Sequence, residues 1–439
     1  MKRQKGINRR GFLKVSALGL AGAGTILAPR TSLAGQDATT EFPKIKGYRT
    51  LGRTGFKVSD IGIGTSSVYP AAIMGTVLDT GVNYIDTAEG YGRTAAEKAA
   101  GEAIKGRDRK SLFITTKVGM RDVADKEQVK DKVAQCMERL QTDYIDCLMI
   151  QGTPTVESLK NEYFHQAVAD LKKESKVRFI GAASHGSRGP GQGEPMETVL
   201  LGAIEDGRFD IVLFVYNFIQ REAGEQILEA AAKKNIGTTI MKSNPLARYF
   251  EMQGKIEQMK KAGEPTDEKA QKFIAQMEET AKKAEPFLQK NNLKEPAEIK
   301  AAALKFVLSN PQVHVLNLAF RNFDDIRSNL ILSGAVLRKK DENILAAYKE
   351  ACGGLYCRHA CGLCESSCPY NVPVNTIMRY SHYFEAQGSE KFAMEKYARL
   401  ETPKADHCRN CAGFCQAACP YGVPIQALLS IAHAQLTMA

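Results

Sequence analysis

The chain has 439 residues, enough for two or three domains and at least one large core, and its content of 44% hydrophobic and 25% charged residues is ordinary for a globular protein. The formal net charge of +11 includes seven positive charges and no acid in residues 1–34, so the rest of the chain carries only +4, too little to indicate a nucleic-acid partner. No apolar run of about 18 residues follows the N-terminus, so we expect no membrane span in the mature chain.

Residues 1–34 are typical of an export signal. A basic stretch ends in Asn8-Arg9-Arg10-Gly11-Phe12-Leu13-Lys14, an apolar run covers 15–27, and Ser32-Leu33-Ala34 has the small residues of a signal-peptidase site. The paired arginines followed by Phe-Leu-Lys resemble the twin-arginine signal, which exports folded proteins. We therefore expect cleavage after Ala34 and a periplasmic or otherwise exported protein. A general secretory signal with a chance arginine pair is the alternative.

Residues 46–335 alternate between short apolar runs and segments of helical periodicity. Eight runs have the length and composition of buried strands: 60–65, 84–88, 112–117, 144–151, 177–184, 211–217, 237–243 and 313–319. Amphipathic segments such as 126–140, 156–174 and 222–234 lie between them. This alternation predicts a parallel (β/α)8 barrel of the TIM type, with an open doubly wound sheet as the alternative. The long connection 244–310 predicts a barrel helix plus a helical insertion over one rim.

Polar side chains stand where the predicted strands end, which is where a parallel barrel places its chemistry. The second strand ends at Asp86 with Tyr91 in the loop that follows, the third ends at Lys117, and the fourth ends at Gln151. A lysine ammonium beside a phenol favours the phenolate, and an aspartate would hold that lysine in place. The pattern predicts a tyrosine that donates or takes a proton near neutral pH.

The segment Gly81-Val82-Asn83-Tyr84-Ile85-Asp86-Thr87-Ala88-Glu89-Gly90-Tyr91-Gly92 resembles the signature of the aldo-keto reductases. Leu51-Gly52-Arg53-Thr54-Gly55, Thr116-Lys117 and Asp143-Tyr144-Ile145-Asp146 fit the same family in order. The resemblance implies hydride transfer between NADP(H) and a small carbonyl or alcohol substrate. It makes Asp86, Tyr91 and Lys117 catalytic and puts Gln151 where the family has histidine. A glutamine can orient a carbonyl oxygen but does not titrate near neutrality.

The same resemblance indicates where a nucleotide would bind. Ser184, His185, Met241 and Lys242 would lie near the nicotinamide. Arg321, Asn322 and Asn329 would lie near the phosphate and adenine end.

Nine of the eleven cysteines lie between Cys352 and Cys419 and form two similar sets. The first is Cys357-x₃-Cys361-x₂-Cys364-x₃-Cys368-Pro369 and the second is Cys408-x₂-Cys411-x₃-Cys415-x₃-Cys419-Pro420. This duplication resembles the ferredoxins that hold two [4Fe-4S] clusters, in which the cysteine before proline reaches the other cluster. The resemblance therefore joins Cys419 to the first three cysteines of set one and Cys368 to the first three of set two.

Other interpretations of the cysteines stay open. Two zinc sites or a disulfide framework are the alternatives, histidine ligation by His359, His382 or His407 is a further one, and Cys352 is a ninth candidate ligand. Cys136 and Cys147, far from the sets, are interpreted as buried apolar thiols.

These features predict an export signal at 1–34, a reductase barrel at 46–335, a linker at 336–350 and a mainly helical, ferredoxin-like two-cluster domain at 351–439. The first functional hypothesis is an exported iron–sulfur oxidoreductase that passes electrons through its clusters to a redox partner protein. The second is a non-catalytic electron-transfer protein or subunit that uses the barrel as a scaffold.

Overall fold

The computed structural model describes residues 41–67, 70–186, 192–245, 275, 296–385, 387–401 and 403–437. The described residues from Phe42 onward belong to one compact unit, which contains all the elements below. The predicted export signal and most of the predicted insertion within 244–310 lie outside the described residues.

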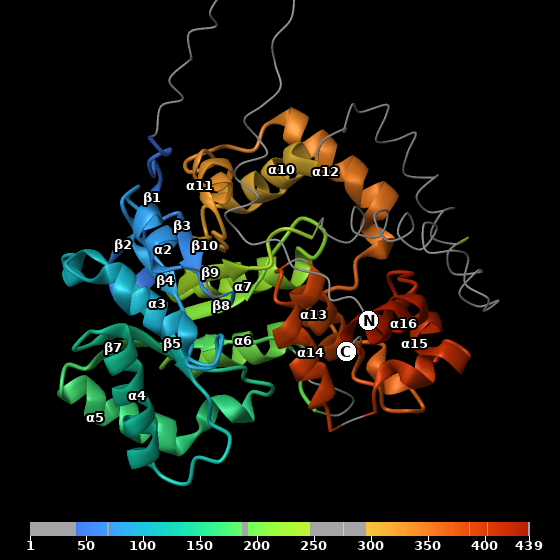
Figure 1. The fold of residues 1–439 in the computed structure, drawn as a ribbon, viewed down its shortest axis with the longest axis horizontal. Helices are drawn as coiled ribbons and strands as arrows, with labels where there is room; N and C mark the ends of the chain where they lie inside the picture. The colour runs from blue at the N-terminus through green and yellow to red at the C-terminus, as the bar shows by residue number, and fades with distance from the viewer. Residues whose placement is uncertain are drawn as a thin grey trace, which may run out of the picture. The chain divides into compact units, whose positions relative to one another are not determined.

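Eight parallel strands close into a barrel in the order β10-β3-β4-β5-β6-β7-β8-β9 (Figure 1). The strands are β3 (Ile61–Gly64), β4 (Tyr84–Asp86), β5 (Phe113–Val118), β6 (Ile145–Ile150), β7 (Val177–Ala183), β8 (Ile211–Val215), β9 (Gly237–Met241) and β10 (Val315–Leu318). Seven fall within predicted strands, and β5 runs one residue beyond the predicted 112–117. The predicted TIM barrel is confirmed, and the open doubly wound sheet is wrong because β10 pairs with both β3 and β9.

Side chains fill the barrel interior and leave no pore. Tyr84 and Phe113 stack with ring centroids 5.7 Å apart, and Cys147 and Leu213 are buried in the same cluster. A hairpin of β1 (Tyr48–Thr50) and β2 (Lys57–Ser59), joined through η1 (Gly52–Thr54), contributes to that cluster. Gly52 has a φ of +47°, and a Cβ there would lie 2.4 Å from the Gly237 nitrogen, so only glycine allows this approach to the start of β9.

Helices on the outside of the barrel bury one apolar face each. They are α2 (Ala71–Leu78), α3 (Ala95–Ile104), α4 (Lys126–Leu140), α5 (Glu162–Lys173), α6 (Met196–Asp206), α7 (Glu222–Lys233), α10 (Pro296–Leu308) and α11 (Phe323–Leu330), with short turns η2 (Arg109–Ser111) and η3 (Glu157–Lys160). In α4 the buried residues Val129, Val133, Cys136 and Leu140 recur at helical spacing. Asp125 begins this helix by accepting the Gln128 N–H. Cys136 is therefore a core residue, as predicted.

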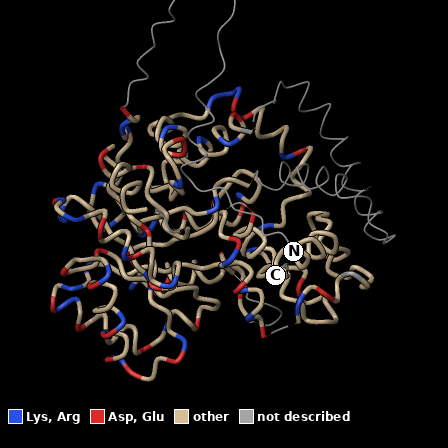
Figure 2. Tube along the Cα trace, in the orientation of Figure 1, with Lys and Arg blue, Asp and Glu red and all other residues tan. Residues whose placement is uncertain are grey.

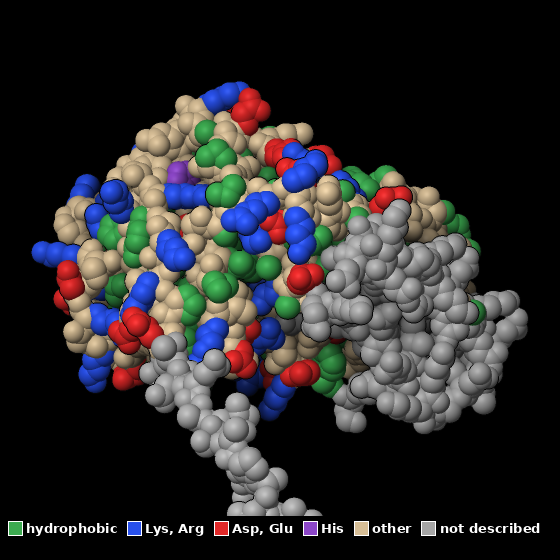
Figure 3. Space-filling view, turned by 90° about the horizontal axis from the view of Figure 1, so that it is seen from above, with side chains coloured by type: hydrophobic (Ala, Val, Ile, Leu, Met, Phe, Trp, Pro, Cys, Tyr) green, Lys and Arg blue, Asp and Glu red, His purple; other side chains and the backbone are tan. Residues whose placement is uncertain are grey.

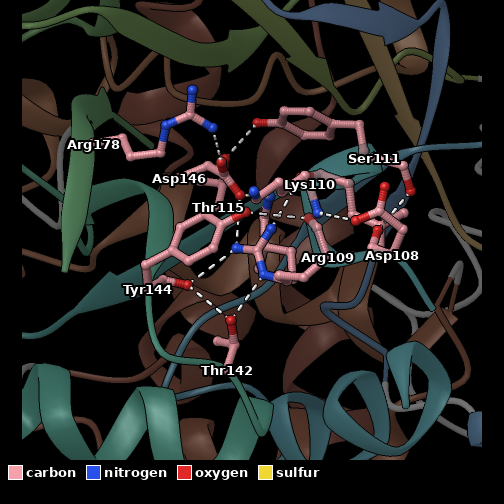
Figure 4. Close-up of polar contacts among 12 residues, drawn as sticks. Asp108, Arg109, Lys110, Ser111, Thr115, Thr142, Tyr144, Asp146 and Arg178 are labelled. Atoms are coloured by element: carbon pink, nitrogen blue, oxygen red, sulfur yellow. Dashed lines mark hydrogen bonds and ion pairs between the residues drawn. The ribbon is translucent and has the colours of Figure 1, made fainter. Parts of the chain in front are cut away.

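A network of charges surrounds Asp146 near the start of β6 (Figure 4). The fully buried carboxylate accepts the Ile114 N–H at 2.9 Å and pairs with Arg109 at 2.7 Å and Arg178 at 2.8 Å. The Arg109 guanidinium also lies 4.0 Å above the Tyr144 ring. These contacts lie toward the N-terminal end of the strands, away from the chemistry-bearing end, so they stabilise the barrel.

The C-terminal region is mainly helical, as predicted. It comprises α12 (Lys339–Cys352), η4 (Gly353–Leu355), η5 (Glu365–Ser367), α13 (Val374–Glu385), α14 (Glu390–Ala398), η6 (Ala405–Asn410), α15 (Phe414–Ala417) and α16 (Ile425–Leu436). Most of the segment predicted as a linker is helix α12, whose Ile344, Leu345 and Tyr348 pack with residues of α10. Beyond it, α13, α14 and α16 share a hydrophobic core with the cysteine loops. We call residues 353–437 the cysteine module.

Positive and negative side chains are interspersed over the described chain (Figure 2), and the face seen in Figure 3 also mixes basic, acidic and apolar side chains. Within the described residues, no helix has the length and apolar character needed to span a membrane.

Candidate functional site

Asp86 and Lys117 form a buried ion pair at the C-terminal ends of β4 and β5. The Lys117 ammonium lies 2.8 Å from both carboxylate oxygens of Asp86 and donates to the Thr87 carbonyl at 2.8 Å. Burial raises the pKa of Asp86, and the Lys117 charge acts in the opposite direction. With three acceptors around its nitrogen, Lys117 is held in one position inside the barrel mouth.

Tyr91 lies beside this pair, in the loop after β4. The Lys117 nitrogen is 5.1 Å from the centroid of the Tyr91 ring, and the Tyr91 N–H donates to the Ala88 carbonyl at 3.1 Å. The structure therefore brings together Asp86, Lys117 and Tyr91, the three residues that the sequence singled out. A fixed ammonium next to a part-buried phenol is an arrangement that can move a proton to or from a substrate oxygen.

Gln151 follows β6 and reaches the same loop. A Cβ at Gly90 would lie 3.0 Å from both the Nε2 and the Oε1 atom of Gln151, so the amide packs directly against the residue before Tyr91. The Gln151 N–H donates to the Val118 carbonyl at 2.9 Å, which holds its backbone at the end of β5. The amide can donate a hydrogen bond at this site, but it has no titratable proton to exchange.

The four residues predicted near a nicotinamide do not all contribute to one site. The Ser184 hydroxyl donates to the Thr153 carbonyl at 3.0 Å and accepts the Gly186 N–H at 3.1 Å, so it organises the rim loop. The Lys242 nitrogen lies 3.2 Å from Nδ1 of His185. Met241 ends β9 and packs against the barrel interior. Lys242 and His185 come together, whereas Ser184 and Met241 serve packing and loop geometry.

Arg321, Asn322 and Asn329 gather around α11. The Asn322 side chain caps this helix by accepting the Asp325 N–H at 2.8 Å, and Arg321 lies 3.5 Å from the Asp325 carboxylate. Asn329 donates to the Ala319 carbonyl at 3.1 Å, while its own buried Oδ1 has no partner among the described residues.

Rim loops of the barrel contact the cysteine module at several points. The contacts join Ser67 to Gln387, Arg93 to Glu395, Asn217 to Tyr356, Gln220 to His359 and Lys242 to Tyr383. At Gly186, which has a φ of +67°, a Cβ would lie 2.3 Å from the Ala360 carbonyl oxygen, so the two backbones touch there. The sequence did not indicate Asn217, Gln220 or Tyr383, because contacts between segments so far apart in the chain leave no local pattern.

The first three cysteines of set one and Cys419 surround one hollow. Cys357, Cys361, Cys364 and Cys419 all line it, together with Arg358, Leu363 and Tyr421. Burial raises the pKa of Cys364, and the nearby thiols of Cys357 and Cys415 raise it further. These four cysteines are the ones that the ferredoxin resemblance assigned to one cluster.

The second set lies close to Cys368. Burial raises the pKa of Cys408 to about 12, and the nearest contributing thiols are Cys415, Cys368 and Cys411. Burial likewise raises the pKa of Cys415 to about 11, again with Cys368 and Cys411 as neighbours. Cys357, Cys361, Cys364 and Cys419 therefore line one hollow, and Cys368 lies within electrostatic reach of Cys408 and Cys415.

Two amide side chains that the sequence analysis missed hold the cysteine loops. Asn375 in the first turn of α13 donates to the Arg358 carbonyl at 3.1 Å. Gln426, at the same offset after the second Cys-Pro pair, donates to the carbonyls of Cys408 at 2.8 Å and Cys411 at 2.6 Å. The signal was present in the repeat, since an amide occupies the same position in both halves.

The other interpretations of the cysteines were disulfides, single-metal sites and ligation by Cys352. Among the described residues, no disulfide joins any two of the cysteines. Cys352 belongs to the hydrophobic cluster of α10 and α12, where burial raises its pKa to about 12. In the described part of the chain, no group of three or more Cys, His, Asp or Glu side chains is spaced to hold a single metal ion. A four-iron cluster spaces its thiolates more widely than one ion does, because each thiolate binds a different iron.

The barrel matches a known protein family. The model of the aldo/keto reductase family matches residues 58–350. The uncharacterized oxidoreductase YqkF of Bacillus subtilis is 32% identical over 150 residues, which is 31% of this chain and 48% of that protein. L-galactose dehydrogenase of Arabidopsis thaliana is 30% identical over 219 residues, or 45% of this chain and 65% of that protein. The chain thus spans about half to two thirds of the length of these relatives.

Among solved structures, the holo form of aldo-keto reductase AKR11C1 from Bacillus halodurans is 21% identical, with a TM-score of 0.49 over 69% of this chain and 95% of that one. The family match covers more than half of the chain and includes Asp86, Tyr91 and Lys117. The chain therefore belongs to the aldo/keto reductase family.

Proposed function

We propose that this protein is an exported oxidoreductase that interconverts a small carbonyl and alcohol with NADP(H), and that two [4Fe-4S] clusters in its cysteine module exchange electrons with a redox partner protein. The observation that carries the proposal is the Lys117 ammonium, fixed by Asp86 within 5.1 Å of the Tyr91 ring at the chemistry-bearing end of the barrel.

Residues of this chain would transfer the proton to or from the substrate oxygen. Tyr91 donates a proton to the carbonyl oxygen or takes one from the alcohol, and Lys117 stabilises the phenolate form that results. Asp86 and the Thr87 carbonyl keep Lys117 in position. The Gln151 amide orients the substrate oxygen without exchanging a proton. NADP(H), when bound, supplies or accepts the hydride.

The start of α11 fits the phosphate end of this nucleotide. Arg321 and Lys300 lie near one another, and burial lowers the pKa of Lys300, which an approaching phosphate would counteract. Arg321 would exchange its contact with Asp325 for the phosphate, and the unpartnered Oδ1 of Asn329 is available to an amino group.

The relatives support the substrate class. They include the NADH-specific methylglyoxal reductase of Escherichia coli, 30% identical over 171 residues, and L-galactose dehydrogenase of Arabidopsis thaliana. One name refers to a small dicarbonyl compound and the other to a sugar. A small carbonyl or alcohol substrate is accordingly proposed here.

The cysteine module fits two clusters. Cys357, Cys361, Cys364 and Cys419 would hold one, and Cys408, Cys411, Cys415 and Cys368 the other. Iron–sulfur clusters take soft thiolate ligands and transfer single electrons. Export by the twin-arginine route suits such a protein, because the clusters would be inserted before the folded chain is exported.

A surface for the redox partner accompanies the cysteines. Leu363 and Phe414 each precede the third cysteine of their set, Tyr370 and Tyr421 each follow a Cys-Pro pair, and all four are large exposed apolar side chains. Such residues beside each cluster would let a partner approach closely through apolar contact.

A second candidate function has its own observation in support. Gln151 lacks the titratable proton of the family's histidine, and the resemblance implies a polar residue on the sixth barrel strand, β8, where this chain has the buried, apolar Leu213. These differences favour a non-catalytic electron-transfer protein that retains the barrel as a scaffold.

One experiment separates the two. The protein is purified without oxygen, denatured, and analysed by absorbance and mass for released NADP(H), and wild type is compared with Tyr91→Phe for NADPH-dependent reduction of methylglyoxal. The enzyme hypothesis is supported if NADP(H) is released or binds on titration, and if Tyr91→Phe lowers the reduction rate by roughly 10²-fold or more without changing the cluster spectrum. No nucleotide binding and equal rates support the scaffold.

A further inference from the structure

Basic side chains from the barrel rim and from the cysteine module gather at one place. Lys242 follows β9, Arg121 follows β5, Arg379 lies on α13 and Lys396 lies on α14. Arg379 is the charge that lowers the pKa of Lys242 in addition to burial. After burial, the charges of Arg399, Arg379 and Arg121 lower the pKa of Lys396. Geometry agrees, because the Tyr383 ring centroid is 5.9 Å from the Lys242 nitrogen and Arg379 lies one turn before Tyr383 on the same face of α13.

Lys242 is the innermost member of this group. Its nitrogen lies 3.2 Å from Nδ1 of His185 and 5.9 Å from the centroid of the Tyr383 ring. Burial lowers the pKa of its amine well below the ordinary value, with Arg379 as the second cause. In the described residues no carboxylate forms an ion pair with Lys242.

Arg379 also has no acidic partner among the residues that the structure describes. Its guanidinium lies 3.4 Å from the Thr376 hydroxyl and 5.8 Å from the Tyr380 ring centroid. Glu395, which acts on Lys396, forms its ion pair with Arg93, two residues after Tyr91. Lys242 and Arg379 are part-buried, and neither forms an ion pair with an acid of the described chain, which is costly; an anion bound between them would offset that cost.

We propose that Lys242 and Arg379 form a binding site for an anionic group, a carboxylate or a phosphate, with Lys396 and Arg121 at its margin. The ligand is then a compound that carries such a group, either the carbonyl or alcohol substrate or the nucleotide. Lys242 and Tyr91 lie in loops at the same end of the barrel, so the anion would be held while the carbonyl faces Tyr91. A guanidinium binds either anion through two hydrogen bonds, which gives direction to the binding.

This inference rests on the proposed reductase function for the identity of the ligand, but binding can be measured without turnover. The same chemistry has two sources, the substrate's own anionic group or the pyrophosphate of the nucleotide. Neither requires the clusters to take part.

The test uses isothermal titration calorimetry of the whole protein, purified without oxygen, with inorganic phosphate as the probe. Lys242→Met and Arg379→Gln should each weaken phosphate binding by about tenfold or more, because each removes a charged hydrogen bond. Lys242→Arg should restore most of the affinity. Lys391→Gln, an exposed lysine at the start of α14, is the matched control and should bind like wild type.

A second readout follows the proton. An anion binds the charged form of Lys242, so phosphate affinity should fall as the pH rises and the amine loses its proton, measured by titrations at several pH values. The groups that face Lys242 among the described residues are His185 from the loop after β7 and Arg379 and Tyr383 from α13. Lys242→Met should lose this contribution to the pH dependence and should retain the wild-type unfolding midpoint, since it removes only a poorly solvated charge.

Competition identifies the source of the anion. Displacement of phosphate by pyruvate but not by NADPH assigns the site to the substrate, and displacement by NADPH assigns it to the nucleotide. Equal phosphate affinity in wild type, Lys242→Met, Arg379→Gln and Lys391→Gln overturns the proposal, as does the absence of any phosphate binding. A positive titration with no reductase activity would leave the anion site standing and remove the proposed reaction.

Discussion

The ammonium of Lys117 lies 2.8 Å from each carboxylate oxygen of Asp86, and the two side chains are almost wholly buried. Because neither charge is solvated, each is stabilised by the opposite charge of the other. Asp86→Asn leaves Lys117 without its counter-charge and should lower the free energy of unfolding by about 3–5 kcal/mol, measured by urea denaturation. The double variant Asp86→Asn/Lys117→Met should recover most of that loss. Equal destabilisation of the single and double variants would show that the unpaired charge of Lys117 is not the cause of the lost stability.

Gln151 packs against Gly90 and cannot relay a proton at this position. Gln151→His restores a titratable group beside the Tyr91 loop. If the barrel is catalytic, we expect kcat to rise by about tenfold or more, within the roughly 10²–10⁴-fold that a positioned acid contributes. The pH–rate profile should gain an inflection near the ordinary pKa of histidine. Gln151→Asn, which is shorter and does not titrate, should show neither change.

Cys419 lines the same hollow as Cys357, Cys361 and Cys364. If each set holds one cluster, the intact protein contains about eight irons and Cys419→Ser should lose about four of them. Cys368→Ser should lose the other four, and the two variants should have different residual cluster spectra. Cys352→Ala is the control because this thiol lies in the core between α10 and α12, and its iron content should match wild type. An iron loss in Cys352→Ala comparable to that in Cys419→Ser would contradict the assignment.

His314 should make the protein sensitive to acid. Its Nδ1 lies 3.1 Å from the Thr238 nitrogen, and burial, followed by the charge of Arg49, lowers its pKa from 6.5 to about 4. Between these values the unfolded chain binds the proton more tightly than the folded chain, so the free energy of unfolding decreases as the pH falls from 6.5 toward 4. The loss is at most about 3 kcal/mol.

His314→Asn keeps an acceptor for the Thr238 N–H and removes the titration. Its free energy of unfolding should therefore change less over the same pH range, measured by urea denaturation at several pH values. A loss as steep as that of wild type would place the acid sensitivity elsewhere.

Local patterns in the sequence were sufficient to predict the barrel and the first three site residues. The eight strands are apolar runs of the right length, and α4 was predicted with its observed ends because its apolar spacing is local. Asp86 and Lys117 were expected to meet because parallel strands end at one face of a barrel. The two sets of cysteines were visible as a repeat for the same reason, since their spacing is short.

Contacts between segments that are far apart in the chain could be known only from the tertiary structure. It placed α13, with Tyr383 and Arg379, beside Lys242 of the rim, and it gave Cys352 a position in a hydrophobic core. Lys242 and Arg379 are separated by more than a hundred residues, and neither belongs to a periodic pattern that refers to the other. Strands and helices arise from periodicities within a few residues, whereas a charge cluster between two structural elements depends on how their surfaces pack, which no short segment encodes.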